Sequence, residues 1–194
     1  MNILIDKLPT EVEGLELNTD FRTSILFELL MQDKDISNED KVALSINLYF
    51  NRQPASIEEM DKMTKAIIWF YSCGNKKKEL KENNQREQIV KKEKKRKQIY
   101  SFEQDDFLIY SAFMEQYNID LNETKLHWWK FKAMFDGLND EILFSKVMGY
   151  RSIDLSKIQD KKQREHYANL QKHWALVDNR SVEEKESDFA NALW

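Results

Sequence analysis

Glycine and proline are scarce in this chain. Its 194 residues include four Gly and two Pro, while 33% of the residues are charged. All-β sandwiches and barrels need a turn signal every ~8–12 residues, and six residues of these two types are too few to supply them. The scarcity therefore excludes an all-β fold and predicts a mainly α protein.

The glycines are also too widely spaced to build a phosphate-binding loop. They stand at positions 14, 74, 137 and 149, so neither the dinucleotide fingerprint nor the P-loop pattern can occur. Cys73 is the only cysteine, which excludes an internal disulfide and a Cys-rich zinc site and fits a reducing compartment. We expect no cofactor and no bound metal.

The residues that could carry catalysis do not form a recognisable set. His166 and His173 are seven positions apart, about two helical turns, so they cannot share a metal without a third element. Cys73 stands at an expected helix C-terminus, where the helix dipole raises a thiol pKa rather than lowering it. No nucleophile has a base in a familiar spacing, so we predict that the protein is not an enzyme.

Long apolar runs are absent as well. No stretch of ~18 apolar residues occurs, and the N-terminus lacks a signal-peptide pattern. These absences predict a soluble protein made inside the cell, with no membrane partner.

Charge is distributed unevenly along the chain. The net charge is −4, yet residues 76–97 hold eleven basic and four acidic side chains, so subtracting their +7 leaves −11 on the rest. Such a segment has too few apolar residues to join a core and is predicted to be a solvated helix or a linker. It divides the chain into an N-terminal lobe (1–75), a second helical lobe (98–177) and an acidic tail (178–194).

Helix signals occur about seven times. Either Asp20 or Thr19 is expected to begin the first helix, and Ser37 and the capping-box residues Ser56 and Ser101 are each expected to begin another. The expected helices span about 20–32, 37–50, 56–73, 101–117, 124–136, 139–149 and 160–177. The first is apolar nearly all round, which predicts burial on more than one side. Alternation around Gly14 predicts a small N-terminal β-hairpin, so the fold class is a mainly α, bundle-like protein with one hairpin.

The segment 126–135, LHWWKFKAMF, is unusually aromatic. On a helix, Trp128, Phe131 and Phe135 would share one face, about 100° away from Trp129. Two interpretations stay open. The helix is central and packed on both faces, since aromatic side chains dominate cores, or the face of Trp128, Phe131 and Phe135 is left open to bind a partner.

The acidic tail ends in SDFANALW. Phe189, Leu193 and Trp194 fall on one helical face behind a capping Ser187, a pattern typical of a docking helix. Apolar residues at a chain end are costly unless they are covered. We therefore weigh two interpretations, in which these three residues bind a partner or this chain itself, or in which the tail is idle.

Several stretches resemble one protein family. MNILIDKLP, LNTDFRTSILFELLM, LHWWKFKAMFDGL and FSKVMGYRSIDLSKI resemble the bacteriophage gene-product-fifteen family, found in tailed phages and prophages of Gram-positive bacteria. The resemblance spans about residues 1–175 and is most specific over 126–158. It transfers no catalytic residue.

This resemblance implies a tail assembly chaperone acting in the host cytoplasm. Genes of this family usually lie between those of the major tail protein and the tape measure protein, and products from that position resemble chaperones that bind the helical, apolar tape measure protein and recruit tail tube subunits. We expect the tape measure protein as partner, with tail tube subunits and a second copy of the chain as further expectations. The seven Met and the many aromatic residues suit adaptable apolar contacts.

Two other functions stay open. A structural subunit kept in the finished tail would have the same composition. A nucleic-acid-binding protein would use the basic segment 76–97, since Lys and Arg bind phosphates without sequence preference. That segment has no aromatic residue to stack on bases and four Glu interrupt it, which disfavours nucleic acid as a partner.

Overall fold

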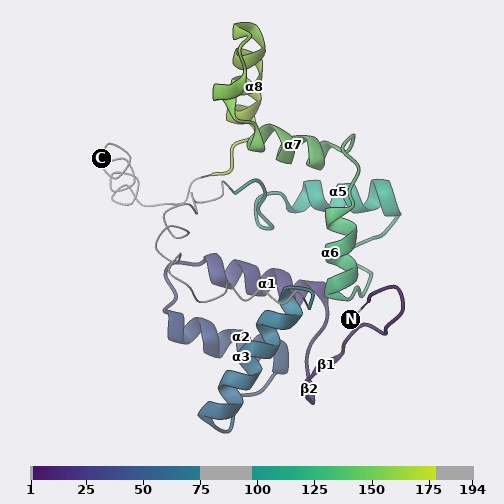
Figure 1. Cartoon of the computed structure of the whole chain (residues 1–194), viewed down its shortest axis with the longest axis vertical. Coiled ribbons are helices and arrows are strands. Elements are labelled where there is room, and N and C mark those ends of the chain that lie inside the picture. The colour runs from purple at the N-terminus through teal and green to yellow at the C-terminus, as the bar shows by residue number, and fades with distance from the viewer. Residues whose placement is uncertain (1, 75–97, 178–194) are drawn as a thin grey trace, which may run out of the picture.

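The structure, a computed structural model of the chain, describes residues 2–74 and 98–177 (Figure 1). This part of the chain forms seven α-helices, one short 3-10 helix and one two-stranded sheet, which confirms a mainly α fold with a small hairpin. The elements are β1 (Glu11–Val12), β2 (Leu15–Glu16), α1 (Phe21–Gln32), α2 (Asn38–Phe50), α3 (Ile57–Tyr71), α5 (Asp106–Tyr117), α6 (Trp128–Asp136), α7 (Leu143–Ser152), η1 (Leu155–Lys157) and α8 (Lys161–His173).

β1 and β2 form an antiparallel hairpin closed by two residues. Val12 pairs with Leu15 across the turn, and the turn residues Glu13 and Gly14 have positive φ angles of 51° and 78°. A two-residue turn with this backbone matches the twist of the strands it joins, and glycine adopts it without strain. The hairpin predicted around Gly14 is confirmed.

Polar side chains begin the first three helices, as predicted. Asp20, Ser37 and Ser56 each accept a hydrogen bond from a backbone N–H two or three residues later, which satisfies one of the free donors in a first helical turn. In the capping box of α3, the Glu59 carboxylate accepts from the N–H of Ala55 at 2.6 Å. Local sequence rules are sufficient for these three starts.

The predicted starts of α5 and α6 are wrong. The Ser101 hydroxyl accepts from two backbone N–H groups at 3.3 Å and closes a separate turn, so α5 begins only at Asp106. α6 begins at Trp128 rather than at about residue 124, because His127 keeps an extended backbone and caps the helix with its ring.

The predicted bounds of α7 and α8 also need correction. α7 begins at Leu143 and runs through Gly149, which lies inside the helix rather than at its end. Asn139 does not cap α7 and instead closes a turn before it. α8 ends at His173, four residues before the predicted Val177.

α6 lies between two groups of helices (Figure 1). α1 packs on α2 and α2 on α3, while α5 contacts α7 and α7 contacts α8. α8 stands at the far end of the molecule and has no buried residue. Among the helices described here, none combines the length and apolarity that crossing a bilayer requires.

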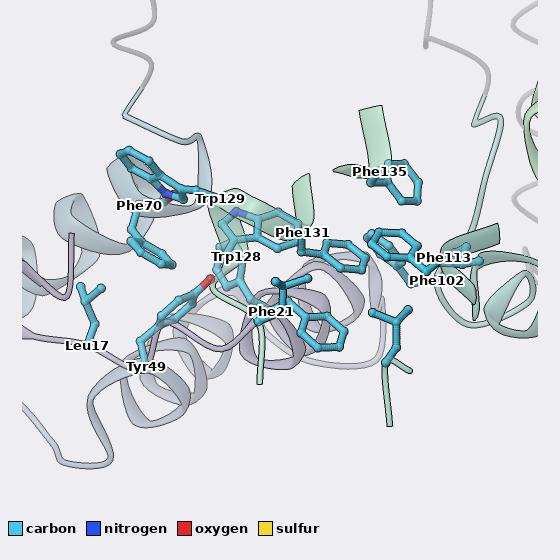
Figure 2. Packing of buried hydrophobic residues seen from close by; sticks show 14 of the residues in the cluster. Leu17, Phe21, Tyr49, Phe70, Phe102, Phe113, Trp128, Trp129, Phe131 and Phe135 are labelled. Atoms are coloured by element: carbon cyan, nitrogen blue, oxygen red, sulfur yellow. The ribbon is translucent and has the colours of Figure 1, made fainter. Parts of the chain in front are cut away.

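One hydrophobic core extends through both groups of helices. The Phe131 ring of α6 stacks on Phe21 of α1, with centroids 4.7 Å apart, and on Phe113 of α5, with centroids 4.9 Å apart (Figure 2). Each such pair adds about 0.5–1.5 kcal/mol beyond area burial. Residues on both sides of the basic segment therefore share one core. The predictions made for residues 76–97 and 178–194 lie outside the described residues.

α6 also closes the C-terminus of α3. The indole N–H groups of Trp128 and Trp129 donate to the carbonyl oxygens of Tyr71 and Phe70, both at 2.8 Å. The last carbonyls of a helix lack the usual donor four residues later. The Trp128 indole supplies a donor to Tyr71, and the Trp129 indole adds a second donor to Phe70, which also accepts from the N–H of Cys73 at 3.0 Å. The chain then turns away through Gly74, which has a φ of 71°, and the helix ends close to the predicted residue 73.

A buried ion pair joins the start of α5 to α7. Arg151 donates to both carboxylate oxygens of Asp105, at 2.6 and 2.9 Å, and the two side chains are 6% and 3% exposed. The same guanidinium donates to the carbonyl oxygens of Ile99 and Trp174. Asp105 is thereby committed to Arg151 and makes no side-chain cap for α5.

His127 connects the hairpin region to α6. Its Nε2 lies 3.0 Å from the carbonyl oxygen of Pro9, and its Nδ1 accepts the backbone N–H of Trp129 at 3.1 Å. Both contacts form only with a neutral ring that carries its proton on Nε2. Burial lowers the pKa of His127 below its usual value, in agreement with a neutral cap.

We expect Gly74→Ala to lower the free energy of unfolding by at least about 1 kcal/mol, because a side chain at this positive φ is strained. The new Cβ would also lie 2.9 Å from the Trp129 ring. Urea unfolding followed by circular dichroism measures the change. Gly149→Ala is the matched control, since nothing lies within 4 Å of its added Cβ and alanine should stabilise α7 by about 0.5–1 kcal/mol. Equal stabilities of the two variants would contradict the close packing at Gly74.

Stability is expected to fall on acidification through His127. Because folding lowers its pKa, the unfolded chain binds more protons, so the contribution is present above about pH 6.5 and is lost as pH falls towards the folded pKa. Urea midpoints measured from about pH 5 to 7.5 should show this slope. His127→Gln should flatten it. An unchanged slope in this variant would refute the role of His127.

Candidate functional site

α1, α2 and α3 enclose an apolar groove of about 270 Å³, which we call the α1–α3 groove. Its lining residues are Phe27, Met31, Asn38, Lys41, Val42, Ser45, Thr64, Ile67 and Ile68. The groove exists because the three helices pack with one another and leave part of their apolar surface uncovered.

Three polar side chains of the groove donate to backbone carbonyl oxygens of the same helices. The Ser45 hydroxyl donates to the carbonyl oxygen of Lys41 at 2.6 Å, and the Thr64 hydroxyl donates to that of Met60 at 2.8 Å. The Lys41 ammonium donates to the carbonyl oxygen of Met31 at 3.2 Å. With these donors engaged, the groove presents mainly methyl and methylene groups to a ligand.

Exposed apolar side chains border the groove and continue along α3. Ile68 is 55% exposed and Met31 is 40% exposed. Met60 and Ile57, also exposed, lie two and three turns before Ile68 on the same side of the helix. Exposed apolar surface of this kind marks interaction sites more often than chance.

The size of the groove suits side chains rather than a whole small molecule. Pockets for drug-sized ligands measure ~300–1,000 Å³, while an apolar cavity of ~150 Å³ already holds a benzene ring. The α1–α3 groove can therefore accept an aromatic ring together with a neighbouring aliphatic group. This is the geometry of recognition in which the apolar face of a helix lies in a groove.

The aromatic face of α6 is not a surface. Trp128, Phe131 and Phe135 are 1%, 0% and 4% exposed, and Figure 2 shows them inside the cluster between the two helix groups. The hypothesis that this face is open to a partner is corrected, because α6 has helices on both sides. The alternative, a central helix packed on both faces, describes these residues.

The family model described as Bacteriophage Gp15 protein matches residues 4–176. The chain belongs to this family. The resemblance predicted from the sequence is thus confirmed, and membership makes the chain a phage structural or assembly protein. Neither the curated proteins nor the solved structures contain a match to it.

The other predicted partner-binding residues of this family member are in the tail. Phe189, Leu193 and Trp194 lie outside the described residues, so their role stays a prediction. His166 and His173 are exposed on α8. Within residues 2–74 and 98–177, no three or more His, Cys, Asp or Glu side chains are placed to hold a metal ion.

Met31 and Ile68 were not predicted as site residues. The signal was present in α1, which was predicted to be buried on more than one side. In the structure its Leu26 and Met31 are 52% and 40% exposed, so the second apolar side of the helix is partly uncovered. On α3, the neighbours Ile67 and Ile68 point to different sides, one buried and one exposed. The available signal was that these helices carry more apolar residues than one core can cover.

Cys73 is expected to react slowly with a thiol reagent. Burial raises the pKa of its thiol, so less of the reactive thiolate is present near pH 8. Modification by Ellman's reagent should be at least about tenfold slower in the folded protein than in urea. Cys73→Ser provides the blank. Equal rates in the folded and unfolded chain would contradict the half-buried position.

Proposed function

We propose that this protein is a non-catalytic tail assembly chaperone that binds the tape measure protein through the α1–α3 groove. The observation that carries the proposal is the apolar groove itself, with Met31 and Ile68 exposed at its border. Tail tube subunits are a second proposed client. A protein of the finished tail would have less use for an uncovered apolar groove.

The exposed apolar stripe of α3 is long enough to contact about three turns of a helical client. From Ile57 to Ile68 the helix rises about 16 Å, which equals about three turns of a partner helix. Each large apolar side chain that the client buries there contributes about 1.5–3 kcal/mol. Methionine at the border adapts to different side chains, which suits a client that presents many similar turns.

The positions of the potential catalytic groups support a non-catalytic role. Both ring nitrogens of His127 are engaged in structural contacts, and burial disfavours the thiolate of Cys73. His166 and His173 are exposed on a helix that has no buried residue. Each of these groups is therefore either engaged in a structural contact, partly buried or exposed to solvent on α8.

Co-expression with the tape measure protein of the same phage tests the proposal. The wild-type protein should keep the tape measure protein soluble and be recovered with it, also at about 0.5 M salt, because apolar contacts are not screened. Ile68→Asp should reduce the recovered complex about tenfold or more, since it places a charge in the interface. Leu143→Asp is the matched control, because Leu143 is 49% exposed on α7, outside the groove.

Failure of the two wild-type proteins to associate, or equal losses in both variants, would refute the proposal. Mass spectrometry of purified virions separates the remaining alternative. A chaperone should be absent from the particle, whereas a fixed copy number would identify a structural subunit.

A further inference from the structure

The free protein needs a cover for the α1–α3 groove, because exposed apolar grooves promote non-specific association. We propose that the C-terminal residues 189–194 occupy this groove in the same chain when no client is bound. The inference rests on the proposed function in one respect, namely that the client uses the same groove. The tail is then an internal competitor of the client.

The composition of the tail fits the groove. Phe189, Leu193 and Trp194 have the i, i+4, i+5 spacing that places apolar side chains on one helical face. The groove volume of about 270 Å³ accepts an aromatic ring. Residues 75–97, the other long segment outside the described part, contain no aromatic residue, which makes them a poorer occupant.

The tail starts from a fixed point, and the number of residues after that point limits how far it extends. The backbone N–H of Val177 donates to Gln104 Oε1 at 2.7 Å, and Gln104 Nε2 donates to the Val177 carbonyl at 3.2 Å. The eleven residues before Phe189 span at most about 36–40 Å. A compact body of about 150 residues has a radius of gyration of about 15 Å, so this length is comparable with its diameter.

Tethering makes a weak contact sufficient. A short flexible connection gives an effective concentration in the millimolar range, so an intrinsically weak apolar contact still covers the groove. A client must displace the tail, which lowers its apparent affinity by the fraction of chains whose groove is free. Substituting the apolar tail residues should therefore increase client binding.

Photo-crosslinking in the full-length chain tests the inference. With p-benzoylphenylalanine in place of Trp194 and no client present, irradiation should produce an intramolecular crosslink to α1 or α3 near Met31 or Ile68. Its yield should not depend on protein concentration. Ile68→Asp should lower the yield about tenfold, whereas Leu143→Asp, equally exposed but outside the groove, should leave it unchanged.

Three results would each overturn the inference: no crosslink, a crosslink outside the groove, or a crosslink formed only between two copies. A combined Phe189→Ser, Leu193→Ser, Trp194→Ser variant adds a second readout, since its recovery of the tape measure protein should rise several-fold. Because the crosslinking assay contains no client, its failure leaves the co-expression result intact. If co-expression fails instead, the crosslinking result still shows whether the tail occupies the groove.

Discussion

The ring of Phe131 lies between those of Phe21 and Phe113, and this stack determines how the two parts of the chain meet. Phe21 precedes the basic segment and Phe113 follows it, so neither part can complete this interior alone. Trp128 and Trp129, next to Phe131 in the sequence, supply donors for the last carbonyls of α3. One short helix thus provides both the apolar filling and the hydrogen bonds that the rest of the fold requires.

Burying the aromatic residues in α6 leaves a different chemistry at the surface. At the border of the groove the exposed apolar side chains are Ile68 and Met31, and flexible aliphatic side chains can adapt to several partners where stacked rings cannot. The stacked interior gives these helices a rigid platform. A rigid platform with an adaptable border suits a protein that must hold a long chain of many similar segments and later release it.

The parts of the fold that depend on nearby residues could be predicted from the sequence. Asp20, Ser37 and Ser56 begin helices because their own side chains satisfy N–H groups within three residues. The predicted start of α6 was wrong because the residue that caps it, His127, is held by Pro9, 118 residues away. The predicted start of α5 was wrong in part because Asp105 pairs with Arg151 of α7. Likewise, no local pattern shows which apolar faces tertiary packing leaves uncovered, so the groove required the structure.

Arg151 holds the chain at two distant places, through the carbonyl oxygens of Ile99 and Trp174. Ile99 follows the basic segment and Trp174 shortly precedes the tail, so the two connections are mechanically linked. Tension on the chain beyond Val177 would first load the hydrogen bonds between Val177 and Gln104, and then the guanidinium that also holds Ile99. A partner that pulled on the acidic tail would therefore also disturb the place where the basic segment rejoins the folded body.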